Sequence, residues 1–418
     1  MVIAMPSTAP RTSAVLLLCA VCMVLEGYDV IAFGATLPHL LADSGWNLTS
    51  RQAGFLGSLT PIGMLFGALL MGWAADLIGR RRLVLISVSL FSGAMLACGM
   101  APNAELFGVS RFAVGLGVGG VLPTVAALVY EYAPDHRRNL YTTLAFAGAG
   151  VGGALAAVIA ATLVPGLGFR FEFLAGGLAA LIVLPLAYFH LPRSADLPTA
   201  GQAAAEYSGL RRFAVLFTRP YLLTTITFGA AMFSALLVVF GLSTWLPVLM
   251  RTAGYPLGSA LTFLVVLNLG TAVGPVVMGK LADRIGSRRA VIISFMTAVV
   301  GVATLSQPLS MLLVYIAVVL AGIGSLGTQI LLNVYIAGRY PAEFRATALG
   351  TALALGRLGG IAGPLYGGVL LDSHLPSAWN FYAFALPAAV GALLIVFLPH
   401  PRRESERPIS LNVVRDPV

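Results

Sequence analysis

The stretch GWAADLIGRRR spans Gly72–Arg82, and a shorter copy of it, DRIGSRR, spans Asp283–Arg289. Both copies have an Asp, then Ile-Gly, then a pair of arginines, and the second Asp follows the first by 207 residues in a chain of 418. The same offset relates glycines elsewhere, so one register runs through both parts of the chain. This repeat predicts two homologous halves in parallel orientation. The matched glycines are Gly63, Gly67, Gly72 and Gly115 with Gly270, Gly274, Gly279 and Gly322.

The composition is that of a membrane protein. Apolar residues make up 58% of the chain and charged residues only 10%, whereas a soluble domain carries about 25% charged residues. The mean hydropathy is +0.92, so a soluble enzyme is excluded. Apolar segments of about 20 residues, the length needed to cross a bilayer, recur along the whole chain. We count twelve, at 13–41, 52–75, 83–101, 105–131, 139–164, 171–191, 220–250, 258–281, 290–307, 309–337, 345–371 and 378–399.

These segments predict an all-α membrane protein with twelve transmembrane helices in two pseudo-symmetric six-helix halves. The first segment continues through Glu26 and Asp29 without a small-residue cleavage site, so we interpret it as a retained span and not as a signal peptide. The expected divisions are an N-terminal half at 1–192, a cytoplasmic linker at 193–219, a C-terminal half at 220–400 and a cytoplasmic tail at 401–418.

The cations are sorted by side. If the chain crosses the membrane twelve times, 20 of the 25 Lys and Arg residues fall on the side of the termini. Arg51, Arg170 and Arg251 fall on the other side, and Arg111 and Arg357 lie within spans. Cytoplasmic loops carry an excess of Lys and Arg, so both termini are expected in the cytoplasm. The formal net charge of +9 then reflects membrane orientation and not nucleic-acid binding.

Four motifs carry a resemblance to a known family. GWAADLIGRRR at Gly72–Arg82 and RFAVGLGVG at Arg111–Gly119 resemble signatures of the major facilitator superfamily. EGYDVIAFGATLP at Glu26–Pro38 and GRLGGIAGP at Gly356–Pro364 are similar to its aromatic acid:proton symporters. Two positions depart from the family pattern, because Leu77 stands where a basic residue is usual and Glu26 where Asp is usual. The resemblance implies the MFS fold and proton-coupled uptake of an aromatic carboxylate, benzoate or hydroxybenzoate-like, by rocker-switch alternating access.

Four charged residues lie inside the expected spans, namely Glu26, Asp29, Arg111 and Arg357. Ionisable groups at the bilayer centre are costly and are functional candidates by default. Glu26 and Asp29 are one helical turn apart, and we expect proton coupling from both; the alternative is that they only pair with Arg111. With Cys19, Cys22, Phe33 and Thr36 they share an arc of about 100°, which we expect to line the transport cavity.

The two arginines are candidate substrate ligands. A guanidinium binds a carboxylate through two parallel hydrogen bonds while it stays ionised. Position and resemblance both favour Arg357 as the substrate clamp. Arg111 is either a second substrate ligand or the counter-ion of the acids in the first span.

Polar and aromatic residues complete the expected binding site. Asn268, Gln329 and Asn333 could hydrogen-bond a ring hydroxyl or the carboxylate, and Phe33, Tyr28 and Trp245 could stack on an aromatic ring. Polar residues in spans also simply join helices, and most aromatic residues in such a chain pack in its core or anchor it at the interface. Both interpretations stay open for each residue.

The repeated loop motif predicts a gate. Asp76 and Asp283 end two corresponding spans and are followed by arginines, so they can latch the cytoplasmic side by pairing with a basic group or a helix N-terminus. We expect Arg80, Glu131 and Arg138 in the same network. The alternative is that these arginines only set the orientation in the membrane.

No catalytic, metal or cofactor site is expected. The five histidines are dispersed and the three cysteines lie in apolar runs, so neither an acid–base cluster nor a zinc site is indicated. The expected partners are a small aromatic carboxylate, protons and the lipid bilayer of the cytoplasmic (inner) membrane, with no nucleic acid and with a monomer as the working unit. The alternatives are a proton-driven efflux antiporter or uptake of a non-aromatic acid such as shikimate. Against the antiporter, GAGVGGALA from Gly148 lacks the Gly-Pro pair usual in drug antiporters of that superfamily.

Overall fold

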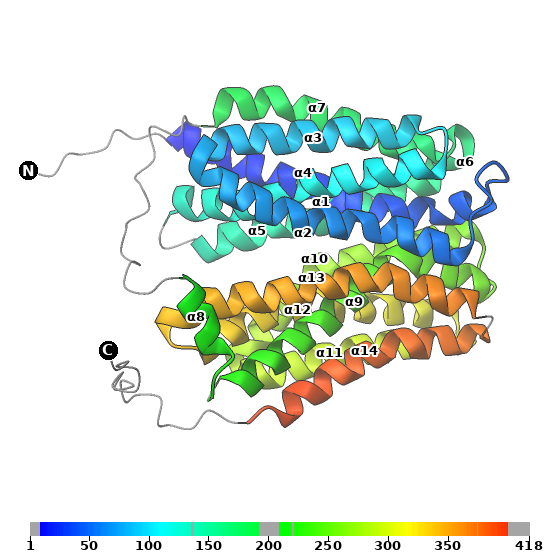
Figure 1. The fold of residues 1–418 in the computed structure, drawn as a ribbon. Coiled ribbons are helices and arrows are strands. Elements are labelled where there is room, and N and C mark those ends of the chain that lie inside the picture. The colour runs from blue at the N-terminus through cyan, green and yellow to red at the C-terminus, as the bar shows by residue number, and fades with distance from the viewer. Residues whose placement is uncertain (1–8, 135–137, 192–208, 220, 374, 400–418) are drawn as a thin grey trace, which may run out of the picture.

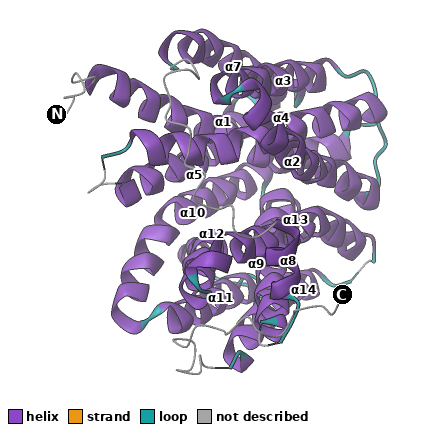
Figure 2. Cartoon of the chain, turned by 60° about the vertical axis from the view of Figure 1, so that its left-hand side comes forward, coloured by secondary structure: helices purple, strands orange, loops and turns teal. Residues whose placement is uncertain are grey.

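The computed structural model describes residues 9–134, 138–191, 209–219, 221–373 and 375–399, and the part it describes is helical (Figures 1 and 2). Twelve of the helices are long and apolar enough to cross a membrane, which confirms the predicted number of spans. Two short helices, α6 and α8, were not predicted. The elements are α1 Ala9–Ala42, α2 Ser50–Ile78, α3 Arg80–Met100, α4 Ala104–Tyr132, α5 Arg138–Thr162, α6 Val164–Leu167, α7 Arg170–His190, α8 Gly209–Leu216, α9 Leu222–Thr252, α10 Leu257–Ile285, α11 Ser287–Thr304, α12 Met311–Arg339, α13 Ala342–Asp372 and α14 Ser377–Phe397.

The helices form two bundles, which lie one above the other in Figure 1. Helices α1 to α7 make the first and α9 to α14 the second, and α8 lies in the segment expected as a linker. We call the end at which α1 begins and α14 finishes the basic end, because Arg81, Arg288 and Arg339 lie there, and the opposite end the far end. Residues 192–208 and the expected tail at 401–418 lie outside the described part of the chain.

The repeated motif makes the same turn in each bundle. Gly79 joins α2 to α3 with a φ of 81°, and Gly286 joins α10 to α11 with a φ of 88°. This left-handed conformation favours glycine. Just after each turn an arginine donates to a carbonyl at the end of the last helix of its own bundle, Arg81 to Tyr188 at 2.5 Å and Arg288 to Val396 at 2.7 Å. One arginine of each motif thus ties the α2–α3 or α10–α11 hairpin to the last span of its bundle.

Glycines bring the helices of each bundle into close contact. A Cβ on Gly115 of α4 would lie 2.1 Å from the carbonyl oxygen of Thr60 on α2. In the second bundle, a Cβ on Gly322 of α12 would lie 2.3 Å from the carbonyl oxygen of Leu267 on α10. Both pairs are related by the offset of 207 residues, so the repeat read in the sequence is also a repeat of backbone contacts.

The two bundles meet through α1 and α9, α2 and α13, and α5 and α10. Near the far end, a Cβ on Gly34 would lie 1.9 Å from the carbonyl oxygen of Ser243, and one on Gly54 would lie 2.6 Å from that of Pro364. An ion pair between Arg51 and Asp372, 3.5 Å apart, joins α2 to α13 at the same end. These contacts hold the bundles together on the far side.

Candidate functional site

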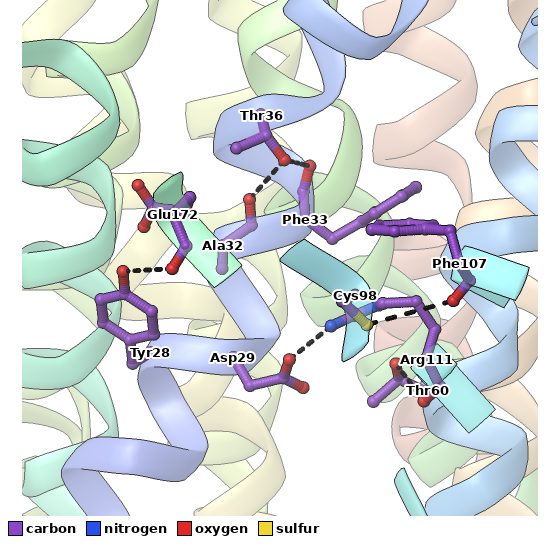
Figure 3. Close-up of polar contacts among 10 residues, drawn as sticks. All are labelled: Tyr28, Asp29, Ala32, Phe33, Thr36, Thr60, Cys98, Phe107, Arg111 and Glu172. Atoms are coloured by element: carbon purple, nitrogen blue, oxygen red, sulfur yellow. Dashed lines mark hydrogen bonds and ion pairs between the residues drawn. The ribbon is translucent and has the colours of Figure 1, made fainter. Parts of the chain in front are cut away.

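The site is built around α1, which packs against helices of both bundles. Asp29 on α1 and Arg111 on α4 form an ion pair (Figure 3), and their side chains are 0% and 2% exposed. The Arg111 guanidinium also lies over the rings of Phe33 and Phe173, at 5.4 and 5.9 Å from their centroids. Arg111 is therefore the counter-ion of Asp29 in this conformation and is not open to a substrate.

Glu26 and Arg357 are arranged differently. Both side chains are half-buried, and they interact electrostatically across the two bundles, since Glu26 lies on α1 and Arg357 on α13. Within the described part of the chain, neither forms a direct ion pair or a side-chain hydrogen bond. Glu26 also lines a small apolar cavity with residues of α3 and α4, among them Val88, Phe91 and Val118. The four charges thus form one closed pair and one open pair.

Most of the expected cavity-lining face of α1 is buried in this conformation, and its lining of a transport cavity stays a prediction. Cys19, Cys22, Asp29, Phe33 and Thr36 are all buried, so only Glu26 of that arc is partly open. Thr36 donates to the carbonyl oxygen of Ala32 at 2.8 Å. The arc packs inside the first bundle, where α1 contacts α4 and α7.

Of the polar candidates, Asn268 lies at a contact between the bundles. Its Nδ2 donates to the carbonyl oxygen of Leu264 at 2.8 Å, and its Oδ1 lies 2.3 Å from where a Cβ on Gly153 of α5 would be. Gln329 and Asn333 are half-buried on α12, and the Oδ1 of Asn333 is buried without a hydrogen-bond partner. The Oδ1 acceptor of Asn333 is therefore free to accept a hydrogen bond, whereas Asn268 lies between two helices.

The aromatic candidates are buried in this conformation. Trp245 is 0% exposed, and its Nε1 donates to the carbonyl oxygen of Pro364 at 2.8 Å, which joins α9 to α13. Tyr28 donates to the carbonyl oxygen of Glu172 at 2.8 Å. Phe33 packs beneath Arg111 and lies 6.2 Å from the ring of Phe107. Stacking of these rings on a substrate stays a prediction, and it would require another conformation.

The predicted cytoplasmic latch is only partly visible. Asp283 is exposed at the basic end, near the end of α10. The side chains of Asp76, Arg80, Glu131 and Arg138 lie outside the described side chains, although their backbones belong to α2, α3, α4 and α5. A latch formed by these residues stays a prediction.

Two features were missed by the sequence analysis. Glu172 is 0% exposed within α7, and neither of its carboxylate oxygens has a hydrogen-bond partner. It lies near the start of a span and two residues after Arg170, so in the sequence it resembles a charged residue of a loop. The Arg51–Asp372 pair was missed because sequence alone does not show which loop residues meet across the bundles.

Two parallel six-helix bundles that enclose a small set of charges are an arrangement found in many secondary transporters. The family model of the Major Facilitator Superfamily matches residues 19–305 and 262–417, and the chain belongs to this superfamily. The superfamily and the relatives described below are transporters, so the chain is a transporter and not an enzyme.

Three relatives match along most of their length. The benzoate transport protein of Acinetobacter baylyi is 32% identical, with 95% of this chain and 91% of the relative covered. The gentisate transporter of Corynebacterium glutamicum is 36% identical (90% and 85% covered), and the 4-hydroxybenzoate transporter PcaK of Acinetobacter baylyi is 29% identical (91% and 89% covered).

Solved structures share the fold. A D-xylose-proton symporter superimposes with a TM-score of 0.75 at 18% identity, covering 92% of this chain and 97% of the other. The nucleoside transporter NupG, in a mutant form, gives 0.77 at 14% identity, covering 92% and 99%. These likenesses confirm the predicted fold.

Proposed function

We propose that the chain takes up an aromatic carboxylate, such as benzoate or a hydroxybenzoate, together with protons across the cytoplasmic membrane. The observation that carries the proposal is the half-buried guanidinium of Arg357, which has no direct carboxylate contact in the described part of the chain. Relatives named for transport of benzoate, gentisate and 4-hydroxybenzoate support the substrate class.

The open pair explains why an anion and a proton would travel together. The substrate carboxylate would bind Arg357 through two charge-assisted hydrogen bonds. Glu26 interacts with the same guanidinium, so an ionised Glu26 would repel the incoming anion. Protonation of Glu26 removes this repulsion. The loaded site then holds one cation and one anion, and this near-neutral state permits closure.

The closed pair provides a second proton site. Asp29 is held by Arg111 and is buried. Protonation of Asp29 would break the ion pair and release Arg111, which then becomes available to the substrate or to water. This step would couple the proton to a rearrangement of α1 against α4.

The halves at 1–192 and 220–400 are the bodies that would rock about this site, with 193–219 as the connection. Because the cations gather at the basic end, we place that end, with both termini, in the cytoplasm. The far-end contacts, including Arg51–Asp372, would then close the outer side and leave the site facing inward. The proton gradient supplies the energy, no cofactor takes part, and the monomer is the working unit.

The test uses purified protein in proteoliposomes. Arg357→Lys keeps the charge but loses the planar, two-bond contact, and Arg357→Ala loses both. A hydrogen bond to a charged group contributes about 1.5–3 kcal/mol, so Lys should weaken benzoate binding by about 10–150-fold and Ala should abolish uptake. Arg251→Ala, an exposed arginine at the far end, is the matched control. Unchanged proton-driven benzoate uptake by Arg357→Ala would refute the site.

A further inference from the structure

Glu172 is an intramembrane carboxyl group that the proposed mechanism does not use. It is the third residue of α7 and is 0% exposed. Both of its carboxylate oxygens are buried without a hydrogen-bond partner. An ionised carboxylate in a dry, apolar site without a partner costs several kcal/mol, so the group in this conformation is the neutral acid.

The neighbours of Glu172 offer no counter-charge. From α1, Tyr28 donates its hydroxyl to the main-chain carbonyl of Glu172 at 2.8 Å, and this neutral hydroxyl also interacts with the Glu172 side chain. On α7 itself, the Nη1 of Arg170 donates to the carbonyl oxygen of Ala101 at 2.6 Å. The cysteine of α3, Cys98, contacts the carbonyl oxygen of Phe107. α6 has no titratable residue, and those of α5 lie at its basic end.

Tyr28 connects Glu172 to the closed ion pair. It directly precedes Asp29 on α1, and Figure 3 shows Tyr28 directed toward Glu172 while Asp29 is directed toward Arg111. The Tyr28 hydroxyl interacts electrostatically with both carboxyl groups. Gly176, one turn after Glu172, makes this possible, because a Cβ there would lie 2.7 Å from the Tyr28 ring. A movement of α1 that separates Asp29 from Arg111 would therefore also move the cover of Glu172.

We propose that Glu172 is a further proton-binding carboxyl of this transporter, in addition to Glu26 and Asp29, and that it is loaded and emptied during the transport cycle. It rests on the proton coupling proposed above. The carboxylate takes a proton from water on the outer side when the far end opens, and the acid gives that proton to water on the cytoplasmic side when a movement of α1 exposes it there. The group lies near the far-end start of α7, so we expect loading from the outer side.

The experiment measures protons carried per benzoate in proteoliposomes for the wild type, Glu172→Gln and Glu105→Gln. Glutamine has the shape of the neutral acid but binds no proton. Glu105 is the matched control, since it lies in the first turn of α4 at the same end and is exposed. Glu172→Gln should carry one proton fewer per benzoate and keep benzoate counterflow, and Glu105→Gln should match the wild type. An unchanged ratio in Glu172→Gln overturns the proposal.

A direct readout covers the case in which Glu172→Gln transports poorly. Infrared difference spectroscopy of the purified protein should show a carbonyl band of a neutral carboxylic acid that Glu172→Gln lacks and Tyr28→Phe shifts. An identical spectrum in Glu172→Gln overturns the proposal. If the wild type itself moved benzoate without protons, the proposed coupling would fail first, so the two failures are distinguishable.

Discussion

Removing either partner of the Asp29–Arg111 pair should destabilise the protein, but not equally. Asp29→Leu leaves a guanidinium that is 2% exposed and always ionised. Breaking a buried pair in this way costs about 3–5 kcal/mol. Cation–π contacts of the guanidinium with the rings of Phe33 and Phe173 offset about 1–2 kcal/mol of this cost at most. Arg111→Met leaves an aspartate that can take up a proton, so its cost should be smaller, about 1–3 kcal/mol.

The double variant Asp29→Leu/Arg111→Met tests the reasoning, because an apolar pair of similar volume is often neutral relative to a buried ion pair. Its loss in the free energy of unfolding, measured by denaturation in mixed micelles, should be well below the sum of the single losses. The exposed Arg51–Asp372 pair is the control, and Asp372→Leu should cost at most about 1 kcal/mol. Additive single losses, or an Arg111→Met loss larger than that of Asp29→Leu, would refute the account.

Two further predictions concern packing and the far-end contact. Gly115→Ala should lower the free energy of unfolding by about 1–3 kcal/mol, because its Cβ would lie 2.1 Å from a carbonyl oxygen of α2. Gly93→Ala, whose Cβ would have nothing within 4 Å, should be neutral or slightly stabilising in the same denaturation assay. Thr244 is a buried residue of α9 at the contact with Gly34 of α1, so a cysteine there reports on opening of the far end. Arg51→Ala breaks the contact with Asp372 and should speed labelling of a Thr244→Cys variant by an impermeant maleimide up to about fivefold at low salt. Unchanged labelling would show that the pair does not hold the far end closed.

The spans and the repeat could be read from the sequence because both are local signals. Hydropathy fixes which segments leave water, and the repeat needs only a constant offset, which the turns at Gly79 and Gly286 reproduce with φ values of 81° and 88°. Helix α8 was missed because its eight residues are too short for a span and lie in a segment with the composition of a linker.

The partners of the charges could not be read in the same way. Glu26 and Asp29 are close on the helical wheel, and the wheel gives no reason why one should be covered by α4 and the other stay half-open. That division depends on how far α1 is turned toward its own bundle, which is set by packing of Phe33 and Tyr28 inside the first half. Glu172 was missed because it lies near the start of its span, and its burial depends on packing of α7 against other helices, which sequence alone does not show.

The repeat also explains why the charges are asymmetric. The position that corresponds to Arg357 in the first half is Gly150, where a Cβ would lie 2.6 Å from the Cβ of Ala272 on α10, so a side chain there would push α5 and α10 apart. The position that corresponds to Arg111 in the second half is Val318, which is 0% exposed. An arginine there would need a buried acid on α9 or its neighbours, and the spans of that half contain none near their centres. Both halves can therefore keep the shared turns and helix contacts. Only the first half holds the closed pair, Asp29 and Arg111, and only the second half holds the open cation, Arg357. In the proposed mechanism, such a division would give the two bundles different affinities for protons and for an anion, which a symmetric duplicate could not provide.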